Sequence, residues 1–195
     1  MTKVFIKVFM VIKQMQWAEP IINRETLCRE KLVSSVDLNA YSGRWHEIAK
    51  SKLAWQLWES GCSHVTADYT ASMCNGNPEL KVVNSCYDDR GNLIIAREAK
   101  GTIPYPDYPG AIHLRFLDPD AKPGVGWYFL HDTDYTSYAV VGSPERKFMW
   151  ILSRSKTICK AKFARLVKMF KEAGYDPRDP EWGLLVNPGT LTECC

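Results

Sequence analysis

Tyr41-Ser42-Gly43-Arg44-Trp45-His46-Glu47-Ile48-Ala49-Lys50 is the stretch of sequence that decides the fold. It opens on a Ser-Gly turn signal and then reads as a strand whose side chains alternate between two faces. The alternation puts Trp45, Glu47 and Ala49 on one face and Arg44, His46, Ile48 and Lys50 on the other. A strand that starts at a glycine and at once buries a tryptophan suits the floor of a β-barrel, because the glycine lets the chain bend and the indole plugs the floor.

A buried indole needs a cover, and an arginine guanidinium stacks well on an aromatic face. A suitable arginine, Arg154, ends the strand-like run at residues 148–154. Counting back by two from Arg154 places Leu152, Trp150 and Phe148 on its face. The sequence therefore predicts that one face of this strand carries both the cover over Trp45 and an apolar lining.

Alternating runs with turns between them continue through the rest of the chain. Together with residues 43–50, the runs at 65–69, 80–85, 93–103, 112–117, 127–131, 137–142 and 148–154 make about eight antiparallel strands. The Asn75-Gly76 pair between the first two of these runs is a hairpin signal. A helix is predicted afterwards, since Phe163, Leu166, Val167 and Phe170 have the spacing of one apolar face. Its other side is basic, which suits a solvated face or, less readily, anionic lipid.

Length and composition agree with one globular domain. The chain has 195 residues, of which 46% are hydrophobic, and a net charge of +3 that is too small to indicate nucleic acid as a partner. Residues 36–195 are expected to form the barrel with its C-terminal helix and tail. Residues 1–35 lack the barrel pattern and are expected to form an N-terminal arm, either disordered or loosely docked, or lying as a helix in a membrane interface.

The apolar run at residues 4–12 is interrupted by Lys7 and is far shorter than the roughly 20 residues that a transmembrane helix needs. It also makes a poor signal peptide, because its uninterrupted apolar core is brief and Gln16-Trp17-Ala18 is a bad cleavage site. We therefore expect a cytoplasmic or peripheral-membrane protein rather than a secreted one.

Three motifs resemble the signatures of the lipocalins, in the family's order and spacing. They are Gly43-Arg44-Trp45, then Thr133-Asp134-Tyr135 followed by Tyr138, then Arg154 after Trp150-Ile151-Leu152-Ser153. The resemblance runs from about Val36 to about Gly189 and is strongest to the bacterial outer-membrane lipocalins, the plant temperature-induced lipocalins and apolipoprotein D. It implies an all-β, eight-stranded antiparallel up-and-down barrel of the calycin type, with a helix packed on it. It also implies that the signature residues close the barrel and contact no ligand: Gly43, Trp45, Thr133, Asp134, Tyr135 and Arg154.

Barrel size leads to the functional prediction, because eight strands enclose an interior that side chains either fill or leave open for one small ligand. The predicted inward set is Val65, Ala67, Tyr69, Val82, Asn84, Leu114, Phe116, Tyr138 and Trp150. Such a lining suits a fatty acid, lysolipid, sterol, retinoid or pigment, which the protein would transport or sequester. Val82 and Ala67 serve equally well as core packing, whereas Trp150 and Tyr138 are predicted ligand contacts. The resemblance adds that the tryptophan matching Trp150 borders the fatty-acyl site in the bacterial relatives.

The sequence offers no catalytic residues, no metal site and no cofactor motif. Its four histidines are scattered. His131, Asp132 and Asp134 are close in sequence but fall on a strand end and within the second motif, and the sequence places no further convergent metal ligand beside them. The alternative is a lipocalin-fold enzyme acting on a lipid or pigment, for which Cys86 is the first thiol to test because it shares the parity of Val82. The expected partners are a small hydrophobic ligand and a peripheral membrane contact, with no nucleic acid, in a monomer or weak dimer.

Seven cysteines leave at least one thiol unpaired. In apolipoprotein D and the insect pigment-binding lipocalins, a cysteine placed like Cys62 bonds one in the C-terminal tail. In an oxidising compartment the resemblance thus implies a bridge from Cys62 to Cys194 or Cys195. In a reducing compartment all of these thiols would stay free.

Overall fold

The computed structural model describes residues 22–118 and 125–193. The elements, in chain order, are α1 Arg24–Leu27, α2 Leu38–Tyr41, β1 Gly43–Ser51, α3 Lys52–Ala54, the π-helix η1 Trp55–Glu59, β2 His64–Cys74, β3 Asn77–Tyr87, β4 Leu93–Thr102, β5 Ala111–Phe116, β6 Val125–Thr133, β7 Tyr138–Gly142, β8 Met149–Ser153, β9 Ile158–Cys159, α4 Lys160–Glu172, β10 Leu184–Val186 and β11 Leu191–Thr192. The larger part of the expected N-terminal arm, residues 1–21, lies outside the described residues, as do Cys194 and Cys195.

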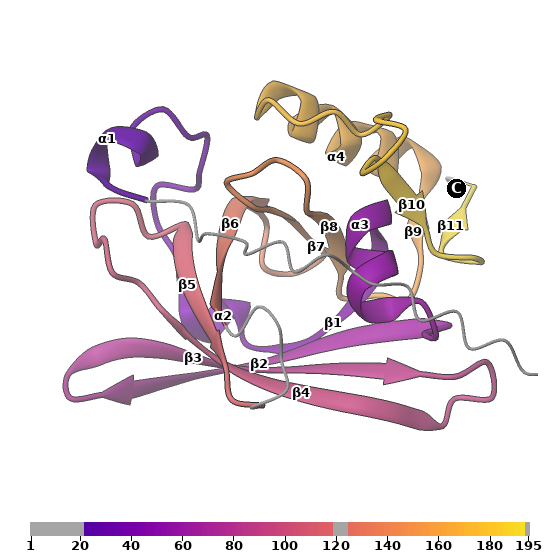
Figure 1. The fold of residues 1–195 in the computed structure, drawn as a ribbon, viewed down its shortest axis with the longest axis horizontal. Helices are drawn as coiled ribbons and strands as arrows, with labels where there is room; N and C mark the ends of the chain where they lie inside the picture. The colour runs from indigo at the N-terminus through magenta and orange to yellow at the C-terminus, as the bar shows by residue number, and fades with distance from the viewer. Residues whose placement is uncertain (1–21, 119–124, 194–195) are drawn as a thin grey trace, which may run out of the picture.

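Strands β1 to β8 pair in sequence order, each antiparallel to the next, and β1 also pairs with β8. This last pairing closes the sheet, so the predicted eight-stranded antiparallel barrel is confirmed. The β2–β3 hairpin turns at Asn75 and Gly76, both with positive φ (51° and 80°), which is the backbone that an Asn-Gly pair adopts readily. Figure 1 shows β2, β3 and β4 as the long strands along one side of the barrel and α4 on the opposite side.

Strand β1 contains an irregularity that overturns part of the predicted alternation. Its register against β8 shifts between Glu47 and Ala49, as at a β-bulge. Lys50 therefore pairs with Trp150 on the inner face, and Ala49 moves to the outer cluster under the helix. The prediction that Lys50 lies on the face opposite to Trp45 is wrong, because a bulge inverts the order of faces after it.

Helix α4 covers the outer wall of the barrel as predicted. Leu166 and Phe170 are fully buried there against Ile48, Val140 and Ile151. The helix ends before Gly174, whose φ of +85° is a conformation that glycine adopts without strain.

Residues 22–35 contact strand β6 and the end of helix α4. Leu27 is fully buried in a cluster with Phe129. His131 fastens the segment, since its Nδ1 lies 2.6 Å from the carbonyl of Lys31 while its Nε2 lies 2.9 Å from the Tyr175 hydroxyl. Burial lowers the pKa of His131 to about 4, so its ring is neutral at neutral pH. The described part of the expected arm therefore packs on the barrel.

The predicted bridge from Cys62 to Cys194 or Cys195 is wrong, because Cys62 is bonded to Cys86, with 5.3 Å between their Cα atoms. The β2–β3 register explains this pairing: Val65 lies opposite Cys86 and so brings the residues just before β2 alongside it. Of the other described cysteines, Cys159 is also disulfide-bonded, and Cys28 and Cys74 are free and exposed.

Candidate functional site

The floor of the barrel is closed by the pair that the sequence indicates. Trp45 is fully buried, and its indole N–H donates to the carbonyl of Tyr41 at 2.9 Å. The guanidinium carbon of Arg154 lies 3.8 Å from the centre of the Trp45 ring. Arg154 also donates to five main-chain carbonyls, those of Ala40, Tyr41, Ser42, Arg44 and Tyr135. These contacts hold the chain that bends under the floor, which is a structural role.

The second motif forms the turn between β6 and β7. Asp134 Oδ1 accepts three backbone N–H groups, from Thr136, Ser137 and Tyr138. Thr133 Oγ1 donates to the carbonyl of Tyr138, and Tyr135 takes a φ of 62° that this turn requires. Thr133, Asp134 and Tyr135 thus shape a turn at the closed end of the barrel.

Most residues of the predicted lining lie on the inner wall. Ala67, Tyr69 and Val82 are buried in the inner cluster, and Leu114, Phe116 and Trp150 pack against that cluster while staying half-buried. Val65 and Asn84 lie on the same strand faces, because Val65 is two residues from Ala67 and Asn84 is the strand partner of Ala67. The structure therefore brings eight of the nine predicted residues to one surface.

Tyr138, the ninth, does not face the interior. It is the strand partner of Ser153 and belongs to the cluster between barrel and helix, with Lys162 and Arg165 of α4 over its ring. Its hydroxyl donates to Asp132 at 2.9 Å. The prediction that Tyr138 contacts a ligand is corrected, since its side chain lies under α4.

An aromatic stack that includes Trp58, which the sequence reading missed, lines the other end of the interior. Trp58 of η1 stacks on Phe148 at 4.9 Å and lies 6.5 Å from Trp150, measured between ring centres. Trp58 is itself exposed, as are Trp55 and Leu57 of the same π-helix. The signal in the sequence was the group of large apolar residues Trp55, Leu57 and Trp58 shortly after the first strand.

Polar groups are also buried in the inner wall, at two levels. Near the floor, the Tyr128 hydroxyl lies 2.6 Å from that of Tyr41 and 3.2 Å from that of Tyr69. Burial raises the pKa of Tyr69 to about 12, so this hydroxyl is neutral and hydrogen-bonded at neutral pH.

Near the aromatic stack, three charged side chains meet. The Lys50 ammonium lies 2.7 Å from Glu47 Oε1 and 2.6 Å from Glu59 Oε2. The side chains of Lys50, Glu47 and Glu59 are 4%, 3% and 14% exposed, so the group is almost removed from water. Burial, and then the charge of Glu47, raise the pKa of the Glu59 carboxyl well above its usual value. Because the group is buried and one ammonium serves two carboxyls, the Glu59 carboxyl ionises with difficulty.

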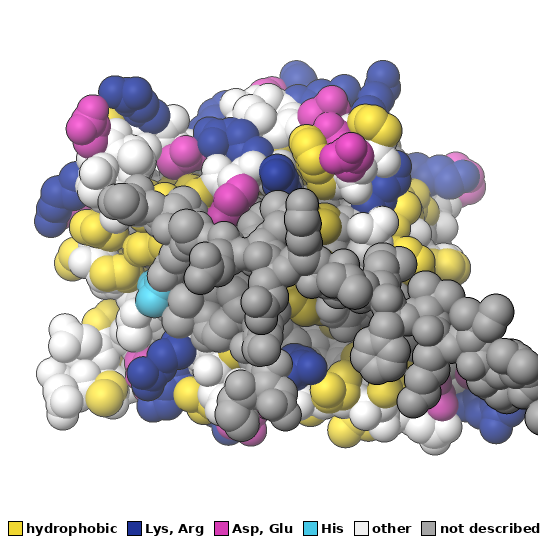
Figure 2. All heavy atoms as spheres, in the orientation of Figure 1, with side chains coloured by type: hydrophobic (Ala, Val, Ile, Leu, Met, Phe, Trp, Pro, Cys, Tyr) yellow, Lys and Arg dark blue, Asp and Glu magenta, His cyan; other side chains and the backbone are white. Residues whose placement is uncertain are grey.

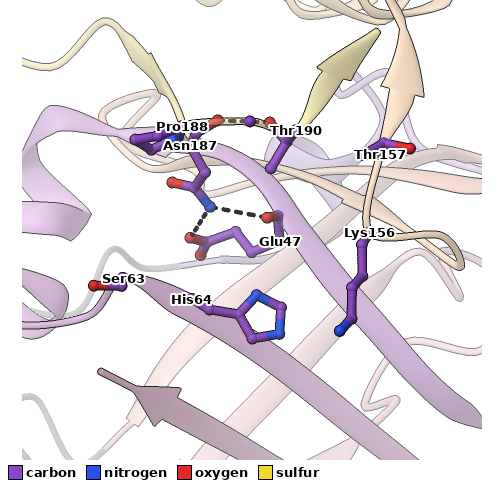
Figure 3. A pocket seen from close by; sticks show the side chains of 9 residues that line it. Glu47, Ser63, His64, Lys156, Thr157, Asn187, Pro188 and Thr190 are labelled. Atoms are coloured by element: carbon purple, nitrogen blue, oxygen red, sulfur yellow. Dashed lines mark hydrogen bonds between the residues drawn. The ribbon is translucent and has the colours of Figure 1, made fainter. Parts of the chain in front are cut away.

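A cleft of about 390 Å³ lies beside this group, between the starts of β2 and β9 and the turn after β10 (Figure 3). Its lining is mostly polar: Glu47, Ser63, His64, Lys156, Thr157, Asn187, Pro188, Gly189 and Thr190. The Asn187 amide donates to both the carboxylate and the carbonyl of Glu47, at 3.0 and 2.8 Å. Burial, and next the charge of Lys156, lower the pKa of His64. A polar cleft of this kind suits a hydrophobic chain less well than the inner wall does.

Across residues 22–118 and 125–193, no three histidine, cysteine or acidic side chains gather as a metal site would require. No helix in the same residues has the length and apolar character to cross a membrane. Figure 2 shows Lys and Arg side chains along the upper edge of the molecule, where α4 lies, so the exposed side of the helix is basic.

Three comparisons place the chain among known proteins. The sequence profile of the lipocalin-like domain matches residues 36–183. The chain is 30% identical over 146 residues to the outer membrane lipoprotein Blc of Vibrio cholerae, covering 75% of this chain and 81% of Blc. It is 28% identical over 151 residues to temperature-induced lipocalin-1 of Arabidopsis thaliana, covering 75% and 77%. Lobster apocrustacyanin A1 has the same fold, with a TM-score of 0.55, 20% identity and coverage of 77% and 79%.

These relatives correct the expected location. The matches in Vibrio cholerae and Escherichia coli are outer membrane lipoproteins, a location that does not fit a cytoplasmic protein. The Cys62–Cys86 bond agrees with this correction, because disulfides persist in oxidising compartments and are rare in the cytosol. The expectation of a cytoplasmic chain is therefore wrong.

The profile match, the relatives and the fold all agree with the three sequence motifs. Proteins of this kind are generally non-enzymatic and bind small hydrophobic ligands in the barrel. The match spans most of the chain and includes both Trp45 and Arg154 of the floor. This protein belongs to the lipocalin family.

Proposed function

We propose that this protein binds a fatty acid, lysolipid, sterol, retinoid or pigment inside its barrel, and transports or sequesters it without chemical change. The observation that carries the proposal is the incomplete burial of Leu114, Phe116 and Trp150. These side chains line the inner wall and pack on its cluster, yet they remain half-buried. Apolar side chains that face inward without being fully covered offer a surface that an apolar ligand would cover.

The energetics favour a ligand with a long apolar part. Each buried methylene contributes about 0.8 kcal/mol, so a chain of about a dozen carbons contributes about 10 kcal/mol, from which the cost of ordering the ligand is subtracted. The aromatic stack of Trp58, Phe148 and Trp150 would flank such a chain where it enters the interior. Binding should therefore quench tryptophan fluorescence.

Catalysis has weaker support. The thiol that the enzyme alternative needed, Cys86, is bonded to Cys62 and has no free sulfur to react. The half-buried His46 and His64, with rings 5.3 Å apart, lie by the polar cleft rather than on the apolar inner wall. We therefore infer binding rather than turnover of the ligand.

A fluorescence titration with a retinoid and a fluorescent fatty acid tests the proposal. Trp150→Ala should weaken binding by about tenfold or more, because it removes inner-wall area next to the ligand. Trp127→Ala is the matched control, since Trp127 is half-buried in the outer cluster with Leu27 and Phe129. Equal affinities in the parent and both variants, or no saturable binding at all, would contradict the proposed site.

A further inference from the structure

We propose that Glu59 holds the place of the ligand's polar head, and that the ligand is a single-chain amphiphile whose carboxyl group replaces Glu59 at Lys50. This inference rests on the proposed function and adds to it a class of ligand and a specificity-determining lysine. In this arrangement the protein supplies its own carboxyl when the interior holds no ligand, and the α3–η1 segment withdraws that carboxyl when a ligand enters.

The two carboxyls around Lys50 are held differently. Glu47 belongs to strand β1, is 3% exposed and is fixed by the Asn187 amide, which donates to its carboxylate at 3.0 Å. Glu59 is the last residue of the π-helix η1, in the connection between β1 and β2, and reaches Lys50 from that connection. A carboxyl on a short connecting segment can leave without disturbing the strands, whereas Glu47 cannot.

The position of Lys50 connects this head site to the inner wall. Lys50 is the strand partner of Trp150, and Trp150 packs on the inner cluster. Trp58, next to Glu59 in the chain, stacks on Phe148 and lies 6.5 Å from Trp150. A ligand with its head at Lys50 would therefore run its chain along Trp150 into the apolar interior.

The replacement of the Glu59 carboxyl by the carboxyl of the ligand explains how a buried lysine accepts a ligand. A carboxyl replaces a carboxyl, so Lys50 keeps the same type of hydrogen-bond acceptor before and after the exchange. Glu59 regains water when it moves out, and the burial of the ligand chain then drives binding. A neutral alcohol would leave Lys50 without its second carboxyl, and an amine would place a second cation beside the ammonium.

Three amphiphiles with the same dodecyl chain test the inference: dodecanoic acid, dodecanol and dodecylamine. Each displaces one fluorescent probe from the full chain at neutral pH, with the disulfides intact. We expect the acid to bind at least about tenfold more tightly than the amine and several-fold more tightly than the alcohol. This comparison uses the parent protein, so it does not depend on the folding of any variant.

Glu59→Ala and Glu59→Gln then test the role of Glu59 as the competing carboxyl. Removal of the competitor should strengthen acid binding by about tenfold for Ala and by less for Gln, which still accepts from Lys50. Alcohol binding should change less than acid binding. Glu98→Ala is the control, since it removes an equal charge from an exposed pair with Lys81 on the outer wall.

The outcomes separate this inference from the proposed function. Equal binding of all three chains, or tighter binding of the amine, would overturn the head site and leave the apolar site standing. Unchanged acid affinity in both Glu59 variants would overturn the exchange. Failure of every chain to bind would overturn the proposed function and, with it, this inference.

Discussion

Replacement of Arg154 by methionine should destabilise the barrel strongly. Methionine keeps most of the apolar stem and removes the guanidinium, so the change is confined to the polar contacts and the cover over the indole. The guanidinium donates to five carbonyls and lies 3.8 Å from the centre of the Trp45 ring.

The magnitude follows from these contacts. A hydrogen bond contributes about 0.5–1.5 kcal/mol net, and the lower end applies here because carbonyls at the barrel end regain water. A cation–π contact that is partly removed from water adds about 1–2 kcal/mol. Together the five hydrogen bonds and the stacking predict a loss of about 3.5–4.5 kcal/mol, which is a large part of the stability of a domain of this size. Arg154→Lys should lose nearly as much, since one ammonium cannot reach carbonyls spread around a planar fork.

Urea unfolding of the oxidised protein measures this loss, and a double-mutant cycle isolates the stacking. Trp45→Leu keeps an apolar plug without a ring face, and the coupling energy with Arg154→Met should be about 1 kcal/mol or more. Arg44→Met is the control: Arg44 pairs with Asp68 at 2.9 Å but is 57% exposed, so its loss should be below about 1 kcal/mol. Additive effects of the Trp45 and Arg154 changes would refute the stacking.

Three further predictions concern the rest of the fold. Cys86→Ser should lower stability by about 3 kcal/mol, because the Cys62–Cys86 bond closes a loop with a sequence separation of 24; a change below 1 kcal/mol in urea would contradict this. The depressed pKa of His131 should make stability fall as pH drops from about 6.5 towards 4, by up to about 3 kcal/mol, since the unfolded chain takes up the proton first; the same pH profile in His131→Gln would refute it. Gly142→Ala should cost about 1–3 kcal/mol because its Cβ would overlap the Tyr175 ring, and calorimetry should find no such loss in a Tyr175→Ala background.

The fold was readable from the sequence because its signals are local. The turn at Asn75-Gly76 fixes the β2–β3 hairpin, and alternation in each strand then identifies its inner face. The pairing of Trp45 with Arg154 was predictable for the same reason, as parity within β8 and a well-known stacking preference led to it.

The errors arose where the position of a side chain depends on the register between paired strands. The register shift in β1 between Glu47 and Ala49 is set by the pairing of β1 with β8. No residue type within β1 predicts this shift. Tyr138 faces α4 because it pairs with Ser153, and the turn between β6 and β7 determines this pairing. The disulfide partner of Cys62 likewise follows from the β2–β3 register and not from spacing along the chain.

The buried group of Glu47, Lys50 and Glu59 is the part of the site that the sequence reading missed most completely, and it allows stability and function to be separated. Replacement of a buried ionic group by apolar residues of similar size is often neutral or stabilising, by about 1–4 kcal/mol. The triple variant Glu47→Leu, Lys50→Met, Glu59→Leu should therefore unfold at an unchanged or higher urea concentration. Its preference for dodecanoic acid over dodecanol should nevertheless disappear, because no ammonium remains to pair with the head. Loss of stability with the acid preference retained would show that these side chains hold the barrel together and do not select the ligand.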